Sequence, residues 1–143
     1  MDNPENSSST LTHGDLTGRI INAFYAVYDE LGYGFLESVY RGALAYELRE
    51  RGLALSVEEP VDVWYKGTKI GHYRADIVIE RRIVIEVKAA KATDESDRRQ
   101  LLNYLRATKL EVGLLLHFGP KAAFQRLVFE NKRKTGIEAV VRG

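Results

Sequence analysis

The stretch that decides the fold is Tyr73–Lys88, which reads YRADIVIERRIVIEVK. Two short apolar runs flank the charged segment Glu80–Arg82, a pattern typical of two strands joined in a hairpin. Side chains alternate between the faces of a strand, so Glu86 and Lys88 share one face and the apolar residues between and before them face a core. A three-residue loop would place Asp76 opposite Glu86 on that face, whereas a two-residue loop would shift the register and separate the two carboxylates.

Two carboxylates and an ammonium on one face of a hairpin indicate metal-dependent hydrolysis. Adjacent carboxylates repel each other, and each tends to hold its proton unless a cation offsets the charge. Mg²⁺ binds through one or two carboxylates together with waters and substrate phosphate, and it can activate a water for attack on phosphorus. Asp76, Glu86 and Lys88 would therefore be a minimal set for hydrolysing a phosphodiester. The alternative is a surface carrying ion pairs only, either Glu86 with Lys88 or Asp76 with Arg74.

The composition is that of an ordinary globular domain. The chain has 143 residues, of which 45% are hydrophobic and 29% charged, and this length is enough for one domain with a real core. We find no apolar run that could span a bilayer and no secretory signal, and the lack of cysteines fits a reducing compartment, so we expect a cytoplasmic protein. The formal net charge is only +1, so a nucleic acid would be held by local basic patches and a metal.

The first half of the chain begins with two predicted helices. Residues 1–13 are polar and are expected to form a flexible tail. Apolar residues at helical spacing predict a helix over 16–31, capped by Asp15 and ended by Gly32. A second helix is expected over 36–51, followed by strands.

Polar residues on the predicted helices have two interpretations. Glu37 lies in a first helical turn, where it either complements the helix dipole and pairs with Arg41 or serves as a third carboxylate at the metal. A further helix is predicted from the capping segment at 93–94 to about residue 108. Gln100 and Tyr104 share one of its faces, where they either bind a scissile phosphate and hold Lys88 in place or form a polar rim with Tyr104 packed on the sheet.

The remaining segments predict strands. Short strands are expected over 53–57 and 61–65, on either side of Pro60, and with the hairpin they would form an antiparallel meander. The apolar run 112–118 predicts a strand buried on both faces and parallel to the Glu86 strand, and a last strand is expected near 124–129. We therefore predict a domain over 14–131 between the N-terminal tail and a basic C-terminal tail, 132–143.

Five segments in order resemble a known family. Residues 34–40, GFLESVY, resemble the signature of the GxxExxY proteins, a family within the PD-(D/E)xK nuclease superfamily. Residues 75–76 (AD) and 86–88 (EVK) resemble the superfamily's catalytic motif, with alanine in place of its proline. Residues 100–104, QLLNY, resemble the Q-x-x-x-Y motif of RecB-like exonucleases. Residues 113–119, GLLLHFG, resemble the family's closing strand, although histidine stands where asparagine is expected.

The resemblance implies roles for individual residues. It implies a set of metal ligands, namely Asp76, Glu86, Glu37 and the backbone carbonyl of Val87. It implies that Lys88 positions the attacking water and acts with the three acids in catalysis. It also implies residues that support the site or the substrate, namely Gln100, Tyr104 and Tyr40.

These observations lead to one expected fold and one expected function. The fold is α/β (α+β), with a restriction-endonuclease-like core in which helices flank a mixed central sheet. The function is a Mg²⁺-dependent (or Mn²⁺-dependent) deoxyribonuclease, with DNA as the expected partner and a homodimer or a protein partner as a further expectation. The alternative is a non-catalytic module of nuclease fold that binds nucleic acid or a protein.

Overall fold

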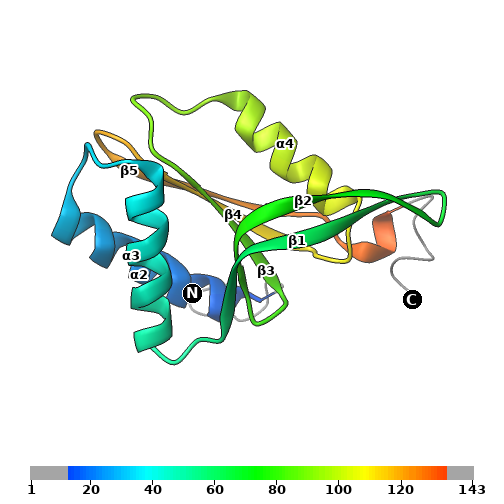
Figure 1. Cartoon of the computed structure of the whole chain (residues 1–143), viewed down its shortest axis with the longest axis horizontal. Coiled ribbons are helices and arrows are strands. Elements are labelled where there is room, and N and C mark those ends of the chain that lie inside the picture. Colours follow the sequence, from blue (N-terminus) through cyan, green and yellow to red (C-terminus); the bar gives the residue numbers. More distant parts are fainter. Residues whose placement is uncertain (1–12, 135–143) are drawn as a thin grey trace, which may run out of the picture.

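A five-stranded mixed sheet forms the centre of the molecule, and helices cover both of its faces (Figure 1). The computed structural model describes residues 13–134, so the predicted tails fall outside it except for His13 and residues 132–134. The strands lie in the order of the chain: β1 (Leu55–Tyr65), β2 (Thr68–Ile79), β3 (Ile83–Lys88), β4 (Val112–Phe118) and β5 (Ala122–Val128). Only β3 and β4 are parallel, as predicted, and the other neighbours are antiparallel.

Within residues 13–134, three α-helices and one short 3₁₀ helix accompany the sheet: α2 (Gly14–Leu31), α3 (Glu37–Glu50), α4 (Glu95–Arg106) and η1 (Asn131–Arg133). Gly32 ends α2 as predicted, with a φ of 72° that favours glycine. The predicted cap by Asp15 is wrong, because the helix starts earlier: His13 is the N-cap and Asp15 lies inside the first turn. The backbone N–H and hydroxyl of Thr17 both donate to the His13 carbonyl and fix this start.

The hairpin between β2 and β3 has the longer loop that the predicted site requires. Ile79 pairs with Ile83 and Ile77 with Ile85, so Glu80–Arg82 form a three-residue loop. The next pair in this register is Asp76 with Glu86. Two residues of the loop, Glu80 and Arg81, have positive φ angles of 53° and 58°, which allows the chain to reverse tightly.

The two short strands predicted on either side of Pro60 are a single strand, β1. This prediction is wrong because proline is tolerated within a strand at the edge of a sheet, and β1 is such an edge. The backbone of Glu58 has a φ of 52°, which marks an irregularity just before the proline, yet Pro60 still lies opposite Arg74 in the ladder.

Two apolar layers enclose the sheet. Helices α2 and α3 pack on one face, where Phe24, Tyr40 and Phe118 are fully buried. Helix α4 packs on the other face through Leu101 and Leu105. The carboxyl end of β3 therefore lies between α3 on one side and α4 on the other. The predicted site residues come from the β2–β3 hairpin and from these two helices.

Candidate active site

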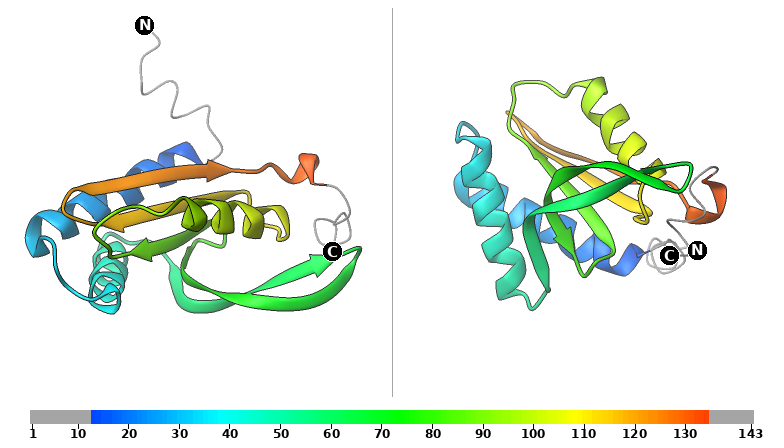
Figure 2. Two further views of the ribbon diagram at one scale, coloured as in Figure 1. Left: turned by 90° about the horizontal axis from the view of Figure 1, so that it is seen from above. Right: turned by 45° about the vertical axis from the view of Figure 1, so that its right-hand side comes forward.

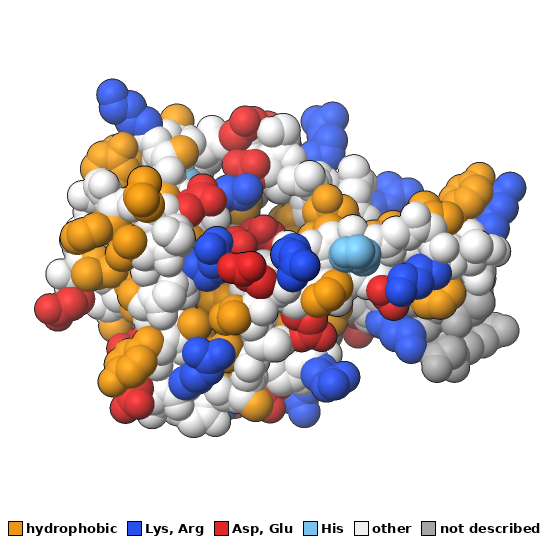
Figure 3. All heavy atoms as spheres, viewed as in Figure 1, with side chains coloured by type: hydrophobic (Ala, Val, Ile, Leu, Met, Phe, Trp, Pro, Cys, Tyr) orange, Lys and Arg blue, Asp and Glu red, His pale blue; other side chains and the backbone are white. Residues whose placement is uncertain are grey.

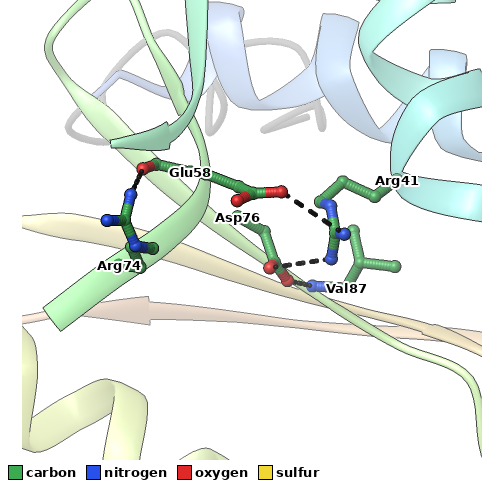
Figure 4. Close-up of polar contacts among 5 residues, drawn as sticks. All are labelled: Arg41, Glu58, Arg74, Asp76 and Val87. Atoms are coloured by element: carbon green, nitrogen blue, oxygen red, sulfur yellow. Dashed lines mark hydrogen bonds and ion pairs between the residues drawn. The ribbon is translucent and has the colours of Figure 1, made fainter. Parts of the chain in front are cut away.

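Asp76 lies on β2, directly before the residues that pair with β3. The ladder between β2 and β3 ends at the pair of Ile77 with Ile85, so the backbone N–H of Val87 has no strand partner there. The carboxylate of Asp76 takes its place: Oδ2 accepts the Val87 N–H at 2.8 Å (Figure 4). Its other oxygen, Oδ1, lies 3.4 Å from a guanidinium nitrogen of Arg41 on α3. The carboxylate is thus held by one neighbouring strand and one helix.

Arg41 links two acids at this point. Its second terminal nitrogen lies 3.6 Å from the carboxylate of Glu58 on β1. The expected pair of Arg41 with Glu37 does not form, because the guanidinium points toward the sheet (Figure 4). The alternative pair of Asp76 with Arg74 does not form either, since Arg74 donates to the backbone carbonyl of Glu58 at 2.9 Å.

Glu86 is a buried acid of the site with a strongly raised pKa. Burial and, second, the neighbouring carboxylate of Asp76 raise the pKa of Glu86 from 4.5 to about 8, against the opposing effect of Lys88. Within residues 13–134 its Oε2 atom is buried and has no hydrogen-bond partner. A buried carboxylate oxygen without a donor is costly, and a cation would satisfy it. The donor set therefore fits a divalent metal.

Lys88 lies at the end of β3, beside helix α4. Its ammonium is 3.7 Å from a carboxylate oxygen of Asp97 on that helix, so it does not form the alternative ion pair with Glu86. His117 is its neighbour in the parallel ladder and is buried, with an Nε2 atom that has no partner among the described residues. These three side chains and Gln125 line a hollow of about 20 Å³, which is room for one water molecule.

Glu37 is close to the site but is not brought to the other two acids. Its Oε2 accepts the backbone N–H of Ala89, the residue after Lys88, at 3.1 Å. Within the described part of the chain, no three acidic or histidine side chains gather as a ready metal cage. This agrees with a site of one or two carboxylates, because Mg²⁺ usually keeps several waters and takes oxygens from the substrate.

Tyr40 supports the corner between the helices. Its hydroxyl donates to the carbonyl of Gly32 and accepts the N–H of Phe35 at 3.2 Å. Its ring stacks on Phe118 with the centroids 4.2 Å apart. Tyr40 therefore fixes the loop that precedes α3. Glu37 is the first residue of this helix and lies one turn before Tyr40.

Gln100 and Tyr104 share a face of α4, as predicted, and the Gln100 amide donates to the Tyr104 hydroxyl at 3.3 Å. The ring of Tyr104 stacks on Tyr73 of β2, with centroids 3.6 Å apart and an angle of 5°. Tyr104 is thus packed on the sheet, and Gln100 reaches it from the preceding turn of α4.

Sequence reasoning missed Tyr73 and Arg41 as members of this site. The hydroxyl of Tyr73 is buried without a partner among the described residues, and burial together with Glu86 raises its pKa. Tyr73 precedes Asp76 by three positions, a spacing that assigns the two residues to opposite faces of a regular strand, so strand alternation did not indicate that Tyr73 belongs to the site. Arg41 lies four residues after Glu37 and therefore on the same helix face, and this shared face could have indicated that Arg41 belongs to the site.

Comparison of the sequence with models of known protein families identifies the superfamily to which the chain belongs. A family model of the PD-(D/E)XK nuclease superfamily matches residues 14–127. The match covers more than half of the chain, and the chain belongs to this superfamily of nucleases. The resemblance seen in the sequence is thereby confirmed at the level of the superfamily, as is the predicted fold class.

The crystal structure of SSO0001 is similar to this fold, with a TM-score of 0.52 and 22% sequence identity over 71% of this chain. The aligned region is 54% of that chain, so the present chain spans about half the length of SSO0001. At this identity the likeness shows the fold alone. No curated protein matches the sequence significantly. None of the described helices has the length and apolar character needed to cross a membrane.

Proposed function

We propose that this chain is a metal-dependent nuclease that hydrolyses phosphodiester bonds, with DNA as its substrate. The observation that carries the proposal is the Asp76–Glu86 pair. Burial and, second, the neighbouring carboxylate of Asp76 raise the pKa of Glu86 to about 8, and one buried oxygen of Glu86 lacks a partner among the described residues. Within the superfamily, we place the chain among the GxxExxY proteins and the RecB-like branch, on the motifs at 34–40 and 100–104.

Mg²⁺ or Mn²⁺ is the cofactor that suits these donors. The residues that would hold it are the carboxylates of Asp76 and Glu86 and the carbonyl of Val87, with Glu37 as a further acid at the edge of the site. When bound, the cation would supply Lewis-acid chemistry, lowering the pKa of a water and offsetting negative charge on the phosphate.

The side chains of the protein divide the remaining work. The Val87 N–H orients the Asp76 carboxylate, and Lys88, held by Asp97, presents an ammonium that orients the attacking water and stabilises hydroxide. Tyr73 and Tyr104 cover the carboxylates on the α4 side, and their low-dielectric surface strengthens each charge interaction beneath them. Gln100 is exposed beside them and would donate to a phosphate oxygen.

The first experiment is cleavage of labelled single- and double-stranded DNA and RNA with Mg²⁺ or Mn²⁺. Wild type should cut, and Lys88→Ala, purified identically, should be slower by on the order of 10²–10⁴ because it loses a positioned group of the chemical step. Arg19→Ala, on the exposed side of α2, is the matched control and should cut like wild type. Equal cleavage by wild type and Lys88→Ala would contradict the proposal, because a contaminating nuclease would then account for the activity.

Metal binding provides an independent measurement. Mg²⁺ at 100 times its Kd should stabilise wild type by about 2.7 kcal/mol, and Asp76→Ala should abolish this effect. The readout is thermal unfolding in EDTA and in Mg²⁺, with Asp62→Ala on the exposed part of β1 as the control that keeps the response.

One observation favours the second candidate, a non-catalytic module that binds nucleic acid or a protein partner. Arg41 already places a positive charge 3.4 Å from Asp76, where it offsets part of the negative charge that would attract a metal. If this second function is right, wild type shows no metal-dependent stabilisation and no cleavage, while nucleic acid or a protein still binds.

We expect a cytoplasmic protein, acting as a homodimer or with a partner.

A further inference from the structure

Strands β1 and β2 continue beyond the sheet as a two-stranded arm, which we define as residues 60–74. The ladder between β2 and β3 begins only at Ile77, so within the part of the chain that the structure describes the arm residues pair with each other and with no third strand. Figure 2 shows the arm curving away from the rest of the sheet. An isolated pair of strands is marginally stable in water, so an arm of this kind needs a further surface to pack on.

The arm contacts helix α4 and its cap at two places, and at the base of the arm the ring of Tyr73 stacks on Tyr104 with the centroids 3.6 Å apart. The backbone N–H of Trp64 donates to the carbonyl of Ala107, the residue that caps the end of α4, at 3.3 Å. Beyond this contact lies the tip, whose turn contains Lys66 and Gly67 with φ angles of 50° and 77°. The arm is thus fixed near its end, and a partner that binds it would not have to order a flexible loop.

The charge on the arm has one sign toward its tip. No aspartate or glutamate occurs between Val63 and Ala75, whereas that segment contains four exposed cationic or titratable side chains, namely Lys66, Lys69, His72 and Arg74. Figure 3 shows lysine and arginine side chains along the arm at the right of the view. Lys69 also pairs with Asp62 at 3.2 Å, and both side chains are about half exposed, so this pair leaves the ammonium accessible.

Exposed apolar side chains lie beside these charges. Tyr65 is 57% exposed and Ile70 is 62% exposed, and the ammonium of Lys66 lies 5.3 Å from the centre of the Tyr65 ring. A convex ribbon that presents both ammonium groups and flat or branched apolar surfaces matches a nucleic-acid groove, whose walls are phosphates and whose floor is base edges.

The arm also has a fixed relation to the site. It ends two residues before Asp76, and Gly67 at its turn lies nine residues before Asp76. At ~3.3 Å per residue the path from the site to the tip is on the order of 30 Å. One turn of a nucleic-acid duplex is about 34 Å long, so a duplex cut at the site would run within reach of the tip.

We propose that the arm lies in a groove of a nucleic-acid duplex, so that its lysines contact phosphates about one helical turn from the bond that is cut. This inference rests on the proposed nuclease function and assigns its substrate class as double-stranded. The major groove admits a two-stranded ribbon, whereas single strands are bound in concave channels lined by aromatic rings.

The test measures duplex binding separately from cleavage. Lys66→Ala/Lys69→Ala is compared with Arg19→Ala/Lys121→Ala, a control pair that removes two exposed cations from α2 and from the β4–β5 turn. Binding of a fluorescein-labelled 30-base-pair duplex, and of the corresponding single strand, is followed by anisotropy in EDTA at several salt concentrations. The arm variant should bind the duplex on the order of tenfold more weakly, and its log–log salt slope should fall by about 1.8 for two lost phosphate contacts.

The control pair should keep both the affinity and the slope, and circular dichroism should show that all variants are folded. An equal loss of duplex affinity in the arm variant and the control variant, or no loss in the arm variant, would overturn the proposal even if wild type cuts DNA. Arm-dependent duplex binding without any cleavage would support the arm and contradict the nuclease function. Light scattering that shows a dimer dissociated by the arm substitutions alone would overturn the proposal in favour of a second copy of the chain.

Discussion

At the scale of single residues, the most direct test of the site is how the free energy of unfolding depends on pH, because Glu86 titrates with a raised pKa. Its pKa is about 8 in the folded protein against 4.5 in the reference state, so between these values the folded protein holds more protons than the unfolded one. The free energy of unfolding of metal-free protein should therefore fall as pH rises from 4.5 to about 8, by on the order of a few kcal/mol, and Glu86→Gln should remove this fall. Urea unfolding in EDTA measures it.

Glu50→Gln, at the exposed end of α3, serves as the control and should keep the wild-type profile. Mg²⁺ should flatten the wild-type profile because the cation compensates the charge that Glu86 acquires. A wild-type stability that does not change between pH 5 and pH 8 in EDTA would contradict the buried, proton-holding carboxylate.

The sequence could predict residues whose relation is set within one hairpin. Asp76 and Glu86 follow from the alternation of a strand and a three-residue loop, and the structure has that register. The sequence could not predict that Arg41 pairs with Asp76 rather than with Glu37, because this pairing depends on how α3 crosses the sheet. The roles of Asp76, Glu86, Lys88 and Glu37 remain predictions until the variants are measured.

At the scale of elements, Tyr40 joins the end of α2 to the start of α3. Removing its hydroxyl in Tyr40→Phe would leave the Gly32 carbonyl and the Phe35 N–H without this partner, while the ring would still stack on Phe118. The free energy of unfolding should fall by about 1–3 kcal/mol. Tyr46→Phe on the same helix, where the side chain is 66% exposed, should change it by less than about 0.5 kcal/mol. Urea denaturation compares the two, and equal effects would refute the proposed role of the hydroxyl.

Elements with a strong period were predictable, and elements shaped by their neighbours were not. The helices over 14–31 and 37–50 and the buried strand over 112–118 follow from apolar spacing and from the glycines that end them. Pro60 suggested a break in β1 because proline usually interrupts strands. That expectation failed because the position of β1 at the sheet edge, which decides whether proline is tolerated, is a property of the whole sheet.

At the scale of the whole molecule, the C-terminal limit of the domain can be measured. Lys134 is buried, and its ammonium donates to the carbonyls of Thr108 at 2.7 Å and Leu110 at 2.8 Å. A protein of residues 13–134 keeps these two hydrogen bonds and serves as the reference. One that ends at residue 131, the predicted domain boundary, should be less stable by about 1–3 kcal/mol. Calorimetry of both, with Lys134→Met as a full-length check, tests this expectation.

The edge position of β1 has a consequence for how the protein behaves at high concentration. A long exposed strand normally offers a continuous row of N–H and C=O groups on which strands of other molecules can assemble into fibrils. Pro60 contributes no N–H to that row, and the left-handed backbone at Glu58 bends it just before the proline. The chain can therefore extend a ribbon of exposed apolar and basic residues into solvent while denying incoming strands an unbroken template for aggregation.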